Sequence, residues 1–250
     1  MTAATTPLRH AEHVMGTVFS FTVRDPGPAT AAALRRATAR LHHLDALFST
    51  YRPDSPVSRL ARGELALADC DPEIAEALRQ CARIAGETDG YFTDHPAGRL
   101  DPSGWVKGLA IEEAADALRA GGSSQYCVSG GGDVQTAGGP WRIGIADPLN
   151  PGALATVITG HDLAVATSGT AERGAHIHDP RTGRPATALA SLTLVGRRIA
   201  DTDACATAAF AMGPDQALTW AAARPDLEAL AILPDGRRLS TPGLARWTAA

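Results

Sequence analysis

The chain has 250 residues, of which 44% are hydrophobic and 20% are charged, and its formal net charge is −4. This length can bury a substantial core, and the composition is that of a folded domain, not of a disordered chain. The mild acidity argues against nucleic-acid binding, which normally uses a basic face. No apolar run is long enough to insert into a membrane, and the N-terminus lacks the apolar stretch of a signal peptide. We therefore expect a cytoplasmic protein, unless a leader has been removed.

The cysteine and lysine contents are both informative. The four cysteines form no C-x-x-C pair, which favours buried thiols over a zinc site or disulfides. They are Cys70, Cys81, Cys127 and Cys205. Of the 23 lysines and arginines, only Lys107 is a lysine. A bias of this kind reflects genome preference, but it makes the exception notable, because arginine is used wherever only a positive charge is needed.

The N-terminal half predicts one strand and several helices. Polar and apolar residues alternate over residues 12–24, which indicates a strand, and residues 1–12 are expected to form a flexible segment. A loop rich in Pro and Ser is expected at 50–58. Three helices are predicted from apolar residues at helical spacing, at 29–48, 72–86 and 105–120.

The C-terminal half mixes short strands with helices. Strands are predicted at 125–129, 141–146, 153–159, 163–168, 189–196 and 227–233. Helices are predicted at 202–212 and 214–224, and Asp235-Gly236 turns a closing hairpin. Because helices and antiparallel hairpins alternate without a βαβ rhythm, we expect an α+β fold of mixed, largely antiparallel sheets packed with helices. Residues 13–250 are expected to form a single domain.

The first candidate motif opens the predicted helix at 105–120. It is Asp101-Pro102-Ser103-Gly104-Trp105-Val106-Lys107-Gly108. A glycine lets a ligand approach the backbone closely, which leaves the Gly104 carbonyl accessible. A helix N-terminus also favours anions such as a pyrophosphate. A capped helix start with a surface salt bridge would have the same sequence, so both interpretations stay open.

Three further segments contain residues that could bind a ligand or act in catalysis. Gly130-Gly131-Gly132-Asp133 follows a strand and suits either a phosphate contact or a plain loop. His176 and His178 would share one face of a strand, as metal ligands or a general base, or would simply stand at a hairpin end. Asp203 and Thr207 would share one side of a helix, as oxygen ligands for magnesium. They could equally be an acid at a helix N-terminus and a threonine bonded to its own turn.

In this order, the motifs resemble those of the FAD:protein FMN transferase family, often called ApbE-like. The resemblance extends from residue 13 to about residue 235. It is carried by Met15-Gly16-Thr17, Phe48-Ser49-Thr50-Tyr51, Asp101 to Gly108, Gly131-Gly132-Asp133, His176 to Gly183, and Asp203 to Thr207. It implies an ApbE-like (T-fold-like) architecture. It also implies magnesium-dependent transfer of FMN from FAD to a Thr or Ser hydroxyl of an acceptor flavoprotein, with release of AMP.

The resemblance also implies the residues of the site. Contacts with FAD are expected from Met15, Tyr51, Tyr91, Phe92, Thr93, Asp101, Lys107, Glu112, Gly132, Asp133 and Ile177. Mg²⁺ is expected on the backbone carbonyl of Gly104 and on the side chains of Asp203 and Thr207. The expected catalytic residues are His176, Lys107 and Asp203, with His176 as the base because a neutral imidazole is available near neutral pH.

Three positions depart from the family's pattern. Thr93 stands where an acid is usual, Ala171 where a tyrosine is usual, and Ala206 where some members have a further acid. Two alternatives therefore stay open. One is a magnesium-dependent FAD hydrolase that produces FMN and AMP, and the other is a protein that binds FAD without turnover.

Overall fold

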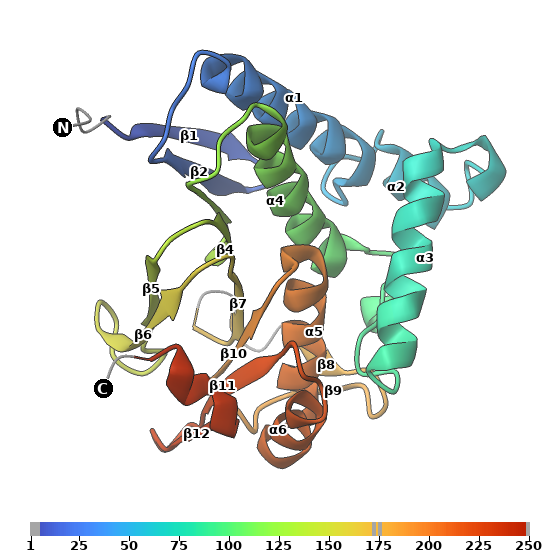
Figure 1. Ribbon diagram of the computed structural model, residues 1–250. Helices are drawn as coiled ribbons and strands as arrows, with labels where there is room; N and C mark the ends of the chain where they lie inside the picture. The colour runs from blue at the N-terminus through green and yellow to red at the C-terminus, as the bar shows by residue number, and fades with distance from the viewer. Residues whose placement is uncertain (1–5, 172–173, 175–176, 249–250) are drawn as a thin grey trace.

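The computed structural model describes residues 6–171, 174 and 177–248. In this part of the chain an antiparallel sheet has eight strands in the order β1-β2-β3-β4-β7-β10-β11-β12 (Figure 1). Its strands are β1 Leu8–Val14, β2 Thr17–Val23, β3 Tyr126–Gly130, β4 Asp133–Ala137, β7 Ala164–Gly169, β10 Ser191–Gly196, β11 Glu228–Ile232 and β12 Arg238–Ser240. Two separate hairpins are formed by β5 Trp141–Ala146 with β6 Leu154–Gly160, and by β8 His178–Asp179 with β9 Arg184–Pro185.

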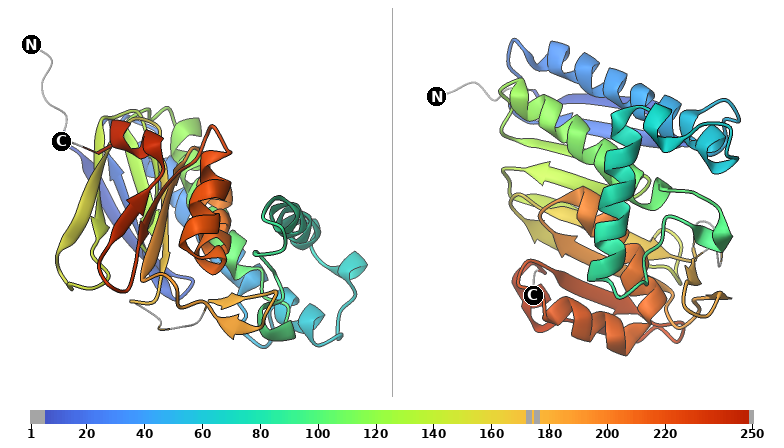
Figure 2. Two further views of the ribbon diagram at one scale, coloured as in Figure 1. Left: turned by 90° about the horizontal axis from the view of Figure 1, so that it is seen from below. Right: turned by 90° about the vertical axis from the view of Figure 1, so that its right-hand side faces the viewer.

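Helices cover one face of this sheet. They are α1 Thr30–Phe48, α2 Pro56–Ala61, α3 Pro72–Glu87, α4 Ser103–Ala120, α5 Ile199–Met212 and α6 Pro214–Ala222. Helices α1, α4, α5 and α6 pack on the sheet, and α3 lies outside α4 and α5 (Figure 2). None of the described helices combines the length and the apolar character that crossing a bilayer would require. The prediction of an α+β fold with antiparallel sheets is confirmed.

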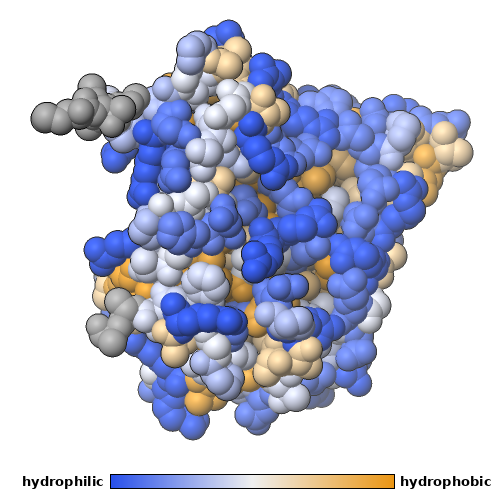
Figure 3. Space-filling view, viewed as in Figure 1, coloured by the Kyte–Doolittle hydropathy of each residue, from blue (hydrophilic) through white to orange (hydrophobic). Residues whose placement is uncertain are grey.

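Alternation along the strands decides which side chains face the helices. On β2, Phe19, Phe21 and Val23 are buried in the main core, whereas Val18 and Ser20 are exposed on the other side. The β5–β6 hairpin and the C-terminal segment cover the far face over β7, β10 and β11, where they enclose a second, smaller core. The surface seen in the orientation of Figure 1 is mostly polar, with smaller apolar patches between the polar side chains (Figure 3).

The predicted strand at 12–24 is in fact two strands. The chain turns at Met15 and Gly16, whose φ angles are 55° and 70°, and the two strands pair along their length. The first strand begins at Leu8, so it occupies part of the segment that was expected to be flexible. The turn was hidden because the alternation of apolar residues continues across it.

Helix α2 and strand β4 were also not predicted. In the expected loop at 50–58, α2 begins at Pro56 because the backbone N–H of Ser58 donates to the hydroxyl of Ser55, 3.1 Å away. Strand β4 begins at Asp133, directly after a tight turn formed by Gly131 and Gly132. Both turn residues have positive φ, 57° and 90°, which glycine adopts without strain.

Helices α4 and α5 cross closely and run antiparallel. A Cβ atom on Gly108 would lie 2.7 Å from both Ala200 Cα and the Ile199 carbonyl, so only glycine fits. One turn further along α4, Glu112 accepts a hydrogen bond of 3.2 Å from the backbone N–H of Ala200 and so caps the start of α5. This crossing brings Asp203, whose Cβ would lie 3.1 Å from the same added Cβ, against α4.

The crossing predicts that Gly108→Ala destabilises the protein. The added methyl group would meet backbone atoms of α5, and overpacking of this kind typically costs about 1–3 kcal/mol. Gly86→Ala is the matched control. Gly86 also lies in a helix and has open space around it, so this variant should gain about 0.5–1 kcal/mol. Thermal unfolding of both variants measures the difference, and equal melting temperatures would contradict the prediction.

Candidate functional site

Three charged side chains from three elements meet under the start of α4. The Lys107 ammonium donates a hydrogen bond to Asp133 and lies 3.2 Å from the nearer carboxylate oxygen of Asp203. Both aspartates are buried, and the lysine side chain is 28% exposed. We call these residues the Lys107 cluster. Three of the expected site residues, far apart in sequence, are thus in direct contact.

Burial and charge act in opposite directions in this cluster. Burial raises the pKa of the Asp203 carboxyl and the nearby Asp133 raises it further, while Lys107 opposes both. Burial alone would lower the pKa of Lys107, but Asp203 and Asp133 outweigh it and raise that pKa. The lysine therefore stays charged, and its charge is what makes the two carboxylates tolerable in the interior.

The surroundings of the cluster hold each carboxylate in place. Asp133 accepts a second hydrogen bond, of 3.0 Å, from the backbone N–H of Thr167 on β7. The hydroxyls of Ser168 and Thr207 lie 3.3 Å apart. The second carboxylate oxygen of Asp203 is buried and has no hydrogen-bond partner among the described residues. A buried oxygen without a hydrogen-bond partner destabilises the folded protein unless a ligand or an ion binds it.

The oxygen donors around this atom fit a hard cation. Asp203 and Thr207 are one turn apart on α5, and the antiparallel crossing places Gly104 of α4 one turn beyond Gly108 in the same direction. A carboxylate, a hydroxyl and a backbone carbonyl are the ligand types that Mg²⁺ takes. The residues expected to hold magnesium therefore form a suitable set.

Two turns at one end of the sheet border the cluster. A Cβ atom on Gly131 would lie 3.5 Å from Lys107 Cδ and 3.7 Å from Thr17 Oγ1. Gly132 is the second residue of that turn, and Met15 lies in the turn just before Thr17. The expected contacts Met15, Gly132 and Asp133 thus lie on the sheet side of the Lys107 cluster.

A pocket of about 710 Å³ is lined in part by residues of α2. Tyr51, another expected flavin contact, also lines it, with 93% of its surface exposed. The lining further includes His95, Arg99 and Leu100. We call this cavity the Tyr51 pocket. Its wall residues His95, Arg99 and Leu100 were not predicted, because isolated residues in an irregular segment have no regular spacing.

The segment from Tyr91 to Asp101 connects the pocket to α4. Phe92 is buried, and one of its ring carbons would lie 3.3 Å from a Cβ on Gly104. The Thr93 hydroxyl accepts from the backbone N–H of His95 at 3.0 Å. Asp101 accepts from the N–H of Ser103 at 3.0 Å and thereby stabilises the first turn of α4.

Tyr91 makes contacts within the protein. Its hydroxyl donates to Gln216 of α6 at 2.9 Å and accepts from Arg181 at 3.0 Å. The Arg181 guanidinium also lies 5.0 Å from the centre of the Tyr91 ring. These contacts fix the β8–β9 hairpin against the body of the protein.

The remaining expected residues lie elsewhere. Both Glu112 oxygens are used at the start of α5, where they accept from Arg198 and Ala200, so the structure does not bring Glu112 into the cluster. Ile177 packs on the main core, and its carbonyl accepts from Ala186 at 2.9 Å. His176, the expected base, lies outside the described residues.

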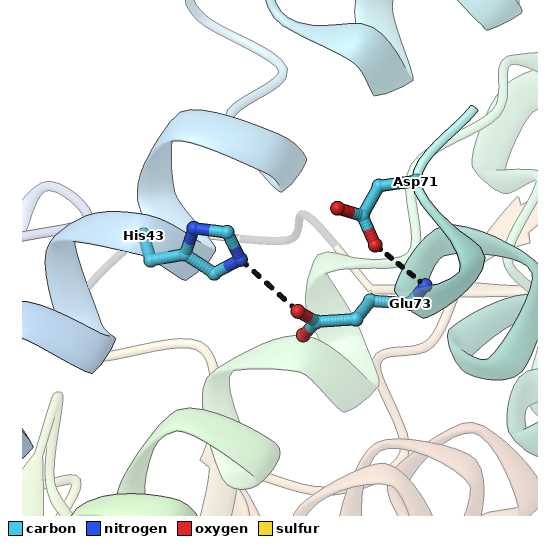
Figure 4. Close-up of side chains that lie close together, drawn as sticks. All are labelled: His43, Asp71 and Glu73. Atoms are coloured by element: carbon cyan, nitrogen blue, oxygen red, sulfur yellow. Dashed lines mark hydrogen bonds and ion pairs between the residues drawn. The ribbon is translucent and has the colours of Figure 1, made fainter.

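His43, Asp71 and Glu73 form a second group of possible metal ligands (Figure 4). His43 lies on α1 and is 3.0 Å from Glu73, and Asp71 accepts from the backbone N–H of Glu73. Both oxygens of Glu73 also accept from the guanidinium of Arg40. A cation already neutralises this carboxylate, so we interpret the group as a clamp between α1 and α3.

The Lys107 cluster predicts a pH-dependent effect of Lys107→Met. Without the lysine, Asp133 and Asp203 share a buried site with no opposite charge between them, and such a loss costs about 3–5 kcal/mol. Lys107 opposes the burial that raises the pKa of Asp203, so without the lysine that pKa rises further. Because a carboxyl with a raised pKa in the folded state loses stability as the pH rises, the deficit should be small at about pH 4 and grow towards about pH 8.

Chemical unfolding at several pH values measures this deficit. Arg79→Met, which breaks the exposed Arg79–Glu76 pair of α3, is the control and should change stability by at most about 1 kcal/mol. A deficit for Lys107→Met that is independent of pH would contradict the interpretation of the cluster.

Comparisons with known proteins agree with this architecture. The flavin transferase ApbE from Vibrio cholerae superimposes with a TM-score of 0.84 at 21% identity, covering 97% of this chain and 99% of that one. The ApbE protein of Thermotoga maritima gives a TM-score of 0.86 at 20% identity, covering 98% and 100%. At these identities the likeness establishes the fold.

Sequence comparisons identify the family. A FAD:protein FMN transferase of Rhodobacter capsulatus is 31% identical over 212 residues, which cover 80% of this chain and 38% of that protein. Another, of Vibrio cholerae, is 29% identical over 178 residues, which cover 65% and 53%. The chain thus spans about half or less of the length of these relatives. The profile of the ApbE family matches residues 15–94 and 93–231, and the chain belongs to the ApbE family.

Proposed function

We propose that this protein transfers FMN from FAD to a Ser or Thr hydroxyl of an acceptor protein and releases AMP. Membership of the ApbE family and the names of the relatives, FAD:protein FMN transferases, support this activity. The observation that carries it is the Lys107 cluster with its unpartnered Asp203 oxygen beside Thr207. That arrangement is suited to hold a cation and to handle an anionic phosphate.

In the proposed reaction an acceptor hydroxyl attacks the phosphorus on the FMN side of FAD. One P–O bond forms, the P–O bond to AMP breaks, and the hydroxyl proton passes to a base, for which His176 is our candidate. Asp203, Thr207 and the Gly104 carbonyl would hold Mg²⁺, which when bound supplies Lewis-acid neutralisation of the phosphate. Lys107 holds Asp203 so that its free oxygen faces the cation site, and the N-terminus of α4 favours the pyrophosphate.

One incubation separates this activity from its alternatives. The protein is mixed with FAD, Mg²⁺ and an acceptor domain that carries the family's pattern, Asp-Gly followed by Ser/Thr-Gly-Ala-Thr. A mass gain of one FMN on the acceptor supports the transferase. Free FMN and AMP without labelling would instead support an FAD hydrolase, and intact FAD would support a protein that only binds it.

The proposed cation site predicts the effect of Asp203→Asn. The amide keeps the shape of the side chain but loses the charge that a divalent cation needs, so transfer should fall by about 10²-fold or more. Excess Mg²⁺ should not restore it. Transfer by the wild-type protein at its normal rate in EDTA would exclude the metal role.

The lone lysine gives a second prediction. Lys107→Arg keeps the charge, but a planar guanidinium does not fit between two carboxylates beside Gly131. We expect transfer to fall by about 10-fold or more with FAD binding retained, because misplacing a site group affects the reaction more than the binding. The matched control is Arg119→Lys, an exposed exchange near the end of α4, and equal transfer rates for the two variants would contradict the role of Lys107.

A further inference from the structure

Outside the Lys107 cluster, two adjacent side chains on the wall of the Tyr51 pocket form a pair. Nδ1 of His95 lies 2.8 Å from a carboxylate oxygen of Asp94. A carboxylate only accepts hydrogen bonds, so Nδ1 carries a proton, and in the tautomer protonated at Nδ1 the other nitrogen, Nε2, is an acceptor. His95 lines the pocket, and its Nε2 has no partner among the described residues.

The backbone around His95 is fixed on both sides. The N–H of His95 donates to the Thr93 hydroxyl at 3.0 Å, and its carbonyl accepts from Gly98 at 3.0 Å. The Asp94 carbonyl accepts from the N–H of Asp101 at 2.7 Å. Between these contacts Ala97 has a φ of 52°, which is unusual for a residue with a side chain. Strain of this kind persists only where the surroundings hold the backbone, and the hydrogen bond to Asp94 then orients the ring of His95.

The pocket combines this hydrogen-bond acceptor with an exposed aromatic ring. The ring of Tyr51 is almost fully exposed on the rim, and leucine side chains, including Leu60 and Leu67, line the interior. Arg99 also lines the pocket, and its guanidinium has no partner among the described residues. A flat apolar face beside a hydrogen-bond acceptor and a donor is complementary to a planar heteroaromatic ring.

We propose that His95 and Arg99 bind the edge of a heteroaromatic ring whose face lies against Tyr51, and that Asp94 positions His95. Nε2 of His95 accepts from an N–H of the ring, and Arg99 donates to a neighbouring carbonyl or ring nitrogen. The inference rests on the proposed function, in which FAD supplies such a ring at either end. Isoalloxazine has an N–H between two carbonyls, and adenine has an amino group beside a ring nitrogen.

Binding of FAD, riboflavin and AMP to the intact protein tests the inference by calorimetry. His95→Ala and Arg99→Ala should each weaken FAD binding by about 3–10-fold, which is the range for one lost hydrogen bond. If the same variants also bind riboflavin more weakly, the pocket holds the flavin ring. If they bind AMP more weakly, the pocket holds the adenine. His161→Ala and Arg36→Ala remove the same side chains from exposed positions on other elements and should bind FAD as the wild type does.

Kinetics and thermal stability together test whether Asp94 positions His95. Asp94→Asn should raise KM for FAD while leaving kcat and the melting temperature unchanged, because only the orientation of His95 is lost.

Unchanged FAD binding in both His95→Ala and Arg99→Ala overturns the inference even if FMN transfer is observed. Weakened FAD binding in these variants, with no transfer by the wild type, overturns the proposed function and supports the inference. A wild-type protein that binds none of the three ligands overturns both.

Discussion

The site depends on one buried contact, the ammonium of Lys107 held between Asp133 and Asp203. When both carboxylates are ionised, two carboxylates and one ammonium leave the cluster one negative charge in excess, in a place where water screens it poorly. The lysine reduces the repulsion between the aspartates but does not remove the excess. A further cation at the free oxygen of Asp203 would do so. The electrostatics of the apoprotein thus favour the cation site that the proposed function requires.

The packing of the helices makes this contact possible. Because Gly108 has no side chain, α5 approaches α4 closely enough for Asp203 to reach Lys107 from the neighbouring helix. Asp133 reaches the lysine from the sheet, because the Gly131–Gly132 turn starts β4 with that side chain on the helical face. Helix crossing and strand register are therefore both part of the site's geometry. A side chain added to α4 at this crossing would disturb the charges as well as the core.

Much of the fold could be predicted from the sequence. Helices α1 and α3 bury one face at regular spacing, and their bounds match the predicted ones within one residue. The Met15 turn could not be found in this way, because a non-glycine residue with positive φ leaves no mark in the apolar pattern. The resemblance to the ApbE family predicted Lys107, Asp133 and Asp203 as site residues. Their contact could not be derived from spacing, because it depends on the register of β3 with β4 and on the crossing of two helices. The wall of the Tyr51 pocket could not be predicted from the sequence pattern, because tertiary contacts alone determine the path of the irregular segment before α4.

The segment from Tyr91 to Lys107 joins the two parts of the site physically. At one end Tyr91 is fixed to α6 and to the β8–β9 hairpin, and at the other the chain enters α4 and reaches the cluster. Between them, His95, Arg99 and Leu100 line the Tyr51 pocket. A ligand with a ring in the pocket and a phosphate near Asp203 must therefore pass the N-terminus of α4, where backbone N–H groups favour an anion. An extended dinucleotide has this order of groups. Because one continuous segment supports both ends, seating the ring would set the position of the phosphate relative to the cluster.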